Sequence, residues 1–189
     1  MPKTVTTTEL TQQIDAVVAR KDSLLRGLSQ TQALWRPQPG AWSIAECLDH
    51  LNRTSSMYLK LMRVTFERER YNASLPPKAF RLGYFVRKFA SYLEPPYRVK
   101  VKAPQSVAPD SDLDLPQVNA EFDRLRLDLR GFVLEAGRVD MGAIAFSSPF
   151  ASILKLNLAE AAVIMLAHDR RHLWQAENVR NHPAFPQGE

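Results

Sequence analysis

Apolar residues recur at spacings of three and four along four long stretches of the sequence, which leaves few folds open to the chain. The stretches run from about 8 to 28, 43 to 70, 116 to 136 and 157 to 181. Each has one apolar side and one polar side, as expected of a helix that packs against others. Because no two segments form a credible strand pair, we predict an all-α four-helix bundle.

Two of the expected helices begin with a capping box. Ser43 is followed three residues later by Glu46, and Asn157 is followed in the same way by Glu160. The first side chain of such a pair accepts a hydrogen bond from a helix N–H that lacks a partner, and the second returns a bond to the first residue. Trp42, just before the second helix, occupies the position of a hydrophobic staple. These motifs set the starts of the second and fourth helices.

The connection between the second and third helices, about 71–115, is long for a helix bundle. The part from Lys78 to Leu93 repeats apolar residues on one side and is predicted to be an additional helix. Prolines indicate that the rest is extended or irregular, and 97–102 alternates like a strand without an obvious partner. We therefore expect a single domain, 1–189, with an insertion at about 71–115 that elaborates this connection.

The composition excludes several classes of protein. With 45% hydrophobic residues in 189, the chain has enough apolar material for a core and is not disordered throughout. A single cysteine, Cys47, excludes an intramolecular disulfide and any metal cluster that needs several cysteines. The glycine-rich signatures of Rossmann and P-loop nucleotide sites are absent from the sequence. The net charge of +5 does not by itself indicate nucleic acid.

The sequence offers no candidate for a secretory signal or a membrane span. Residues 1–8 lack the apolar centre of a signal peptide. The longest apolar run, from Leu158 to Ala167, is short and is interrupted by Glu160. We therefore expect a soluble cytoplasmic protein with neither a membrane nor a nucleic acid as its partner.

The segment from Lys60 to Lys102 is both basic and aromatic. Such a segment can attract an anionic substrate, a membrane surface or a nucleic acid. The simpler interpretation, which we favour, is a solvated face whose aromatic rings cover one end of the bundle. As a further hypothesis, the helix expected at 78–93 borders the entrance to the histidine site described next, with Phe85 and Phe89 as an apolar wall.

Two histidines in the fourth helix lie on the side that faces the core. His168 and His172 are four residues apart, so their side chains project from one face of a helix and can reach one metal ion. The intervening Asp169, Arg170 and Arg171 do not match the HExxH signature of zinc proteases. A solvated pair near the end of a helix is the alternative interpretation.

His50 in the second helix supplies a third candidate ligand. Helix bundles commonly form metal sites from side chains on facing helices. One histidine from the second helix and two from the fourth would give three nitrogen ligands. A fourth coordination position would then stay open for water, which is typical of catalytic rather than structural zinc sites.

These residues resemble the DinB-like (YfiT-like) metalloprotein superfamily. The run W-S-I-x-E-x-x-x-H-L, from Trp42 to Leu51, is similar to the second-helix signature of that family. The run H-D-x-x-H-x-x-Q, from His168 to Gln175, is similar to its fourth-helix signature. The two motifs occur in the expected order, and the resemblance covers most of the chain. Only the connection at 71–115 is longer than in the family.

The resemblance implies a four-helix bundle, usually dimeric, in which three histidines hold a divalent metal, zinc or nickel most often. In this sequence those residues are His50, His168 and His172. Family members include transferases and isomerases that use low-molecular-weight thiols, so the implied partner is a small-molecule substrate, with such a thiol as one candidate.

The remaining polar residues near the motifs have simpler roles. Cys47 is expected to pack in the core as a small apolar side chain. Glu46 is expected to cap its helix, with support of His50 as the alternative. Asp169 is expected to orient a neighbour or form a salt bridge, and His182 to be exposed beside Pro183.

Two classes of function remain open. The first is a metal-dependent enzyme that activates water for hydrolysis or a thiol for transfer. The second is a non-catalytic bundle in which the metal only ties two helices together. We also expect a two-fold homodimer, because the fourth helix has apolar residues on more than one side. Those beside the histidines are Leu158, Val163, Leu166 and Leu173.

Overall fold

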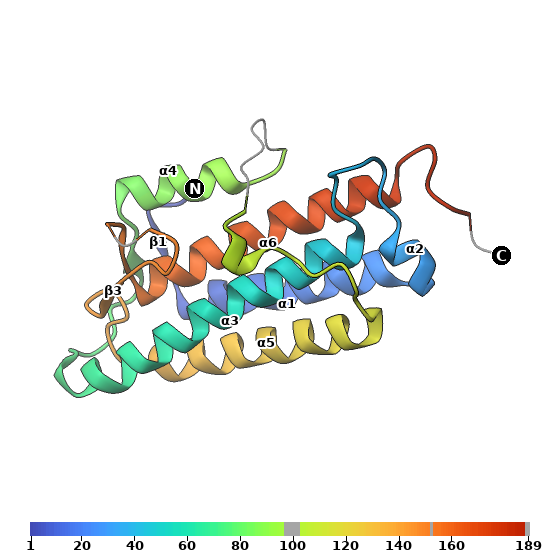
Figure 1. The fold of residues 1–189 in the computed structure, drawn as a ribbon. Helices are drawn as coiled ribbons and strands as arrows, with labels where there is room; N and C mark the ends of the chain where they lie inside the picture. Colours follow the sequence, from blue (N-terminus) through green and yellow to red (C-terminus); the bar gives the residue numbers. More distant parts are fainter. Residues whose placement is uncertain (97–102, 152, 188–189) are drawn as a thin grey trace.

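The computed structural model describes residues 1–96, 103–151 and 153–187, and α-helices dominate it (Figure 1). The helices are α1 (Thr7–Leu25), α2 (Gln30–Leu34), α3 (Ile44–Glu69), α4 (Tyr84–Leu93), α5 (Leu115–Ala136) and α6 (Leu158–Arg180). Two short 3-10 turns, η1 (Arg70–Asn72) and η2 (Gln105–Val107), flank α4 in the sequence. The strands are β1 (Thr4–Val5), β2 (Phe80–Arg81), β3 (Ala145–Ser147) and β4 (Lys155–Asn157), and they form the antiparallel pairs β1–β2 and β3–β4.

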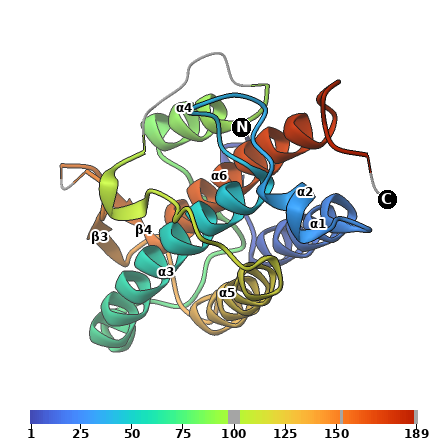
Figure 2. The same ribbon diagram turned by 45° about the vertical axis from the view of Figure 1, so that its right-hand side comes forward.

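Helices α1, α3, α5 and α6 form the four-helix bundle that the periodicity predicts (Figure 2). α1 and α3 each contact both α5 and α6, so the four helices surround a common apolar core. The capping boxes begin α3 and α6 as expected, with the Ser43 and Asn157 side chains accepting from the N–H groups three residues on. The all-α prediction is therefore confirmed.

The neighbouring helices α3 and α5 run in the same direction. In the N-terminal halves of both helices Asn52 Nδ2 donates to the Val118 carbonyl at 2.9 Å, and further along both of them Arg63 donates to the Asp128 carbonyl. Parallel neighbours require the chain to return along the whole bundle between them. The long connection between α3 and α5 makes this return and carries α4, which packs against α6 (Figure 1).

The short elements differ in several places from the prediction. The additional helix begins at Tyr84 rather than Lys78, because Phe80 and Arg81 pair with the N-terminal strand β1. α1 ends at Leu25 rather than near 28, and Gly27 follows it with a φ of +71° that favours glycine. The strand-like residues 97–102 lie outside the described residues.

Helix α6 is surrounded by other parts of the chain. It contacts α1, α3 and α4, and 16 of its residues are buried. The apolar residues from which the sequence indicated a second, dimer-forming face are therefore covered within the chain itself. They are Leu158, Val163, Leu166 and Leu173, each at most 4% exposed. In the part of the chain that the structure describes, no helix has the length and apolarity to cross a lipid bilayer.

Candidate metal centre

Three histidines from two helices face one another in the bundle. His50 lies in the second turn of α3, and His168 and His172 lie one turn apart on α6. The ring centroid of His50 is 5.1 Å from that of His168 and 4.7 Å from that of His172. The centroids of the two α6 rings are 4.6 Å apart. One nitrogen from each ring lies within 4.8 Å of the others. The structure thus shows the convergence that the sequence predicts.

Hydrogen bonds fix which nitrogen of two of these rings faces the centre. Nδ1 of His50 lies 2.7 Å from the carbonyl oxygen of Val107, and Nδ1 of His172 lies 3.0 Å from Oε1 of Gln175. Because both partners are acceptors, each Nδ1 carries the proton and each Nε2 keeps its lone pair. A hydrogen-bond acceptor on the nitrogen that faces away from the ion is typical of histidines that bind metals.

The spacing of the nitrogens also suits a metal ion. Nε2 of His50 is 3.3 Å from Nε2 of His168. Two nitrogens at zinc–nitrogen distances of about 2.0–2.1 Å and a tetrahedral angle lie roughly 3.3–3.5 Å apart. The Nε2 atom of His50 carries a lone pair, so a cation between the two rings would satisfy it. The donor set, three imidazole nitrogens, is one that zinc, nickel and other divalent transition metals accept.

The electrostatic surroundings keep the three rings neutral. Loss of solvation on burial is the main reason that the pKa of each histidine is lowered, to about 3 for His172 and well below the usual value for His168. For His50 the hydrogen bond to Val107 and the charge of Asp49 oppose this effect. Since a protonated imidazole cannot bind a metal, the lowered pKa values leave the rings ready for ligation at neutral pH.

Trp42 lies against the histidine cluster. Its ring centroid is 4.9 Å from that of His50 and 5.6 Å from that of His172. The sequence predicted that Trp42 would act as a hydrophobic staple at the start of α3. It did not predict that the indole would contact two of the histidine rings. The indole is partly buried and covers one side of the cluster, which limits access of water there.

Asp169 forms a salt bridge, as expected, and its partner is on another helix. Its carboxylate binds the guanidinium of Arg126 on α5 through two oxygens, and both side chains are at most 2% exposed. The pair ties α6 to α5 at the residue next to His168. Asp169 is therefore a structural neighbour of the cluster and does not belong to it.

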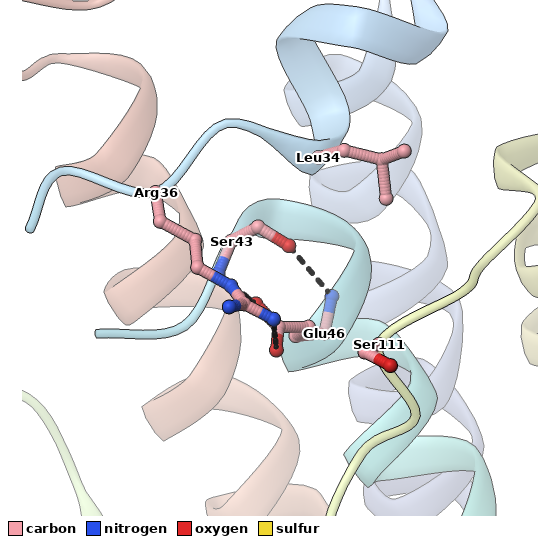
Figure 3. A pocket seen from close by; sticks show the side chains of 5 residues that line it. All are labelled: Leu34, Arg36, Ser43, Glu46 and Ser111. Carbon is pink, nitrogen blue, oxygen red and sulfur yellow. Dashed lines mark hydrogen bonds and ion pairs between the residues drawn. The ribbon is translucent and has the colours of Figure 1, made fainter. Parts of the chain in front are cut away.

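Glu46 caps its own helix and also lines a recess beside it. Its carboxylate accepts from the Ser43 N–H at 2.8 Å and from two nitrogens of Arg36. The recess has a volume of about 400 Å³ and is lined by Leu34, Arg36, Ser43, Glu46 and Ser111, with Arg36 reaching the carboxylate (Figure 3). It opens one turn before His50 on α3. With Arg36 and a backbone N–H bound to it, Glu46 is not a free base.

The other residues considered in the sequence analysis are not part of the histidine cluster. Cys47 is fully buried, and burial raises the pKa of its thiol, so it stays protonated and packs as an apolar side chain. His182 is exposed and its ring lies 5.5 Å from that of Trp35, beyond the end of α6.

α4 runs beside α6 from Glu160 to Arg170, with Phe85 80% exposed. That the helix borders the entrance to the site stays a prediction.

Two contacts that support the cluster were not predicted from the sequence, although Gln175 belongs to the fourth-helix motif. Gln175 had a signal, because a residue three positions after His172 lies on the same helix face. The Val107 carbonyl had none, because a backbone group in an irregular segment leaves no pattern of side chains.

The fold and the cluster together define a class: a four-helix bundle with a three-histidine group of metal-binding type between two facing helices. The chain belongs to the DinB superfamily, whose family model matches residues 13–176. Among solved structures it is similar to YfiT from Bacillus subtilis, described as a probable metal-dependent hydrolase with an unusual four-helix bundle topology. The TM-score is 0.61 at 13% identity, and the match covers 95% of this chain and 89% of that chain. No curated protein matches the sequence.

Proposed function

We propose that this protein is a metal-dependent enzyme in which Nε2 of His50, His168 and His172 hold one divalent cation, zinc or nickel. The observation that carries the proposal is the convergence of three neutral imidazoles, two of which have their remote nitrogen tied to an acceptor. Membership of the DinB superfamily and the likeness of the fold to a probable metal-dependent hydrolase support it.

The chemistry follows from three protein ligands and a remaining coordination position. A bound divalent cation would lower the pKa of a water or thiol at that position and polarise the group under attack. The chain contributes orientation through Val107 and Gln175, and Trp42 shields one side from water. We propose a small-molecule substrate, with hydrolysis or transfer of a low-molecular-weight thiol as the reaction.

The proposal is tested by assaying the metal-loaded protein. Hydrolysable esters and amides, and electrophiles offered with and without a thiol such as glutathione, should reveal turnover that chelation abolishes and added metal restores. If chelation lowers the melting temperature and no substrate is turned over, the metal has the structural role that was left open above.

Trp42 provides an optical reading of the site. Because its ring contacts those of His50 and His172, binding of Ni²⁺ or Co²⁺ is expected to quench its fluorescence. The variant Trp42→Phe should lose most of this quenching. The matched control Trp35→Phe should keep it, because Trp35 packs on His182 and Phe185 instead. Equal quenching in both variants would contradict this assignment.

We also propose that the protein is a homodimer, as is usual in the family. The described chain leaves four aromatic side chains of α4 exposed, and exposed apolar surface of this kind favours association. They are Tyr84, Phe85, Phe89 and Tyr92. Sedimentation at tens of micromolar is expected to give twice the monomer mass, and a monomer at that concentration would reject the proposal.

A further inference from the structure

A short piece of the connection between α4 and α5 lies against α3 beside the histidine cluster (Figure 2, yellow-green). Its 3-10 turn η2 directs the carbonyl of Val107 toward Nδ1 of His50. The side chain of Val107 is 1% exposed, so the turn is packed into the protein at this point. The carbonyl that sets the proton position of His50 therefore comes from a loop, and something must hold that loop in place.

Three charged residues, Asp49, Arg53 and Asp110, hold it, and we call them the clasp. Oδ2 of Asp49 accepts from the backbone N–H of Asp110 at 3.0 Å and from Nε of Arg53 at 2.7 Å. The Arg53 guanidinium also binds the Asp110 carboxylate. The Asp49 side chain is only 14% exposed, although it is charged. The clasp thus joins the loop to the turn of α3 that carries His50.

Of the contacts that hold the loop after Val107, the clasp is the nearest along the chain. Asp110 follows Val107 by three residues, a span of roughly 10 Å at most. The next anchor is Gln30 of α2, whose side-chain amide bonds the backbone of Leu113 and Leu115. Because the Gln30 contacts are more distant along the chain, they are expected to constrain the Val107 carbonyl less than the clasp does.

We propose that the clasp positions the metal centre: by holding the Val107 carbonyl against His50, it keeps the proton on Nδ1 and the lone pair on Nε2. The metal-binding part of this inference rests on the proposed function, whereas the proton position does not. The ion pair between Arg53 and Asp110 is partly to largely exposed, and such pairs contribute little to stability. Choosing between the two neutral forms of an imidazole requires only a small energy difference, so even a modest contact is sufficient for this role.

The test reads the proton position directly in the metal-free protein. Nitrogen-15 NMR of the imidazole rings is expected to show wild-type His50 protonated on Nδ1. In Asp49→Ala it should show a mixture of the two neutral forms, and the dissociation constant for Zn²⁺ should rise about tenfold. Asp49→Asn keeps an oxygen that can accept from the Asp110 N–H, so it should retain most of the wild-type behaviour. The controls Asp112→Asn and Gln30→Ala should match the wild type.

The outcomes separate this inference from the proposed function. If His50 stays protonated on Nδ1 in Asp49→Ala, the clasp does not position it and the inference is wrong. A wild-type protein that binds no Zn²⁺ overturns the proposed function, yet the NMR comparison still decides the proton position. Should Asp49→Ala fail to fold, Asp110→Pro removes both the backbone N–H and the carboxylate that the loop contributes to the clasp, at an exposed position, and serves the same comparison.

Discussion

Metal content is expected to fall from about one equivalent to none when any one of His50, His168 or His172 is replaced by alanine. In the proposed site three imidazoles share a single ion, and removing one leaves two ligands, which bind a divalent metal far more weakly. The variants should stay folded, because α3 and α6 keep their other contacts and alanine is a strong helix former. Elemental analysis of each purified variant measures the effect.

The matched control is His182→Ala. It removes the same side chain from an exposed position outside the cluster, so full metal content is expected. Full metal content in any of the three cluster variants would show that the ion is held elsewhere and would end the proposed site. If a cluster variant kept metal but its circular dichroism changed, the helices would have rearranged around the ion. Replacing the same histidine by glutamine, which keeps more of the side-chain volume, then distinguishes a role in binding the metal from a role in packing.

The parts of the structure that the sequence predicted are those that local rules determine. The capping box at Ser43 depends on residues within four positions, and the helical period of α6 places His168 and His172 on one face. The third histidine was a candidate because helix bundles commonly form metal sites from side chains on facing helices. Family resemblance then gave the same three residues.

The parts that the sequence did not reveal depend on contacts between distant segments. β2 forms because Phe80 and Arg81 meet Thr4 and Val5, and neither two-residue strand is recognisable without the other. The role of Val107 is carried by its backbone, which any residue would supply. The direction of α5 relative to α3 likewise follows from the return of the connection along the bundle.

Breaking the buried ion pair between Arg126 and Asp169 is expected to destabilise the bundle strongly. Asp169→Ala would leave the Arg126 guanidinium without its carboxylate at 0% exposure, stacked 3.9 Å from the centroid of the apolar Phe122 ring. Removing one partner of a buried pair typically costs about 3–5 kcal/mol. Urea unfolding should be measured with chelator present, so that any metal bound at the neighbouring His168 adds nothing to the difference in unfolding free energy.

Two further variants test whether the expected loss of stability arises because the ion pair is buried. Arg130→Ala removes a pair of similar chemistry with Asp15, but both side chains are about half exposed, so the cost should stay below roughly 1 kcal/mol. The double variant Arg126→Met/Asp169→Leu removes both charges and should recover much of the stability, because neither charge is then left unpaired. If Asp169→Ala cost no more than Arg130→Ala, the Arg126 guanidinium would have to reach water in the folded state. The α5–α6 contact beside the histidine cluster would then be looser than the structure shows.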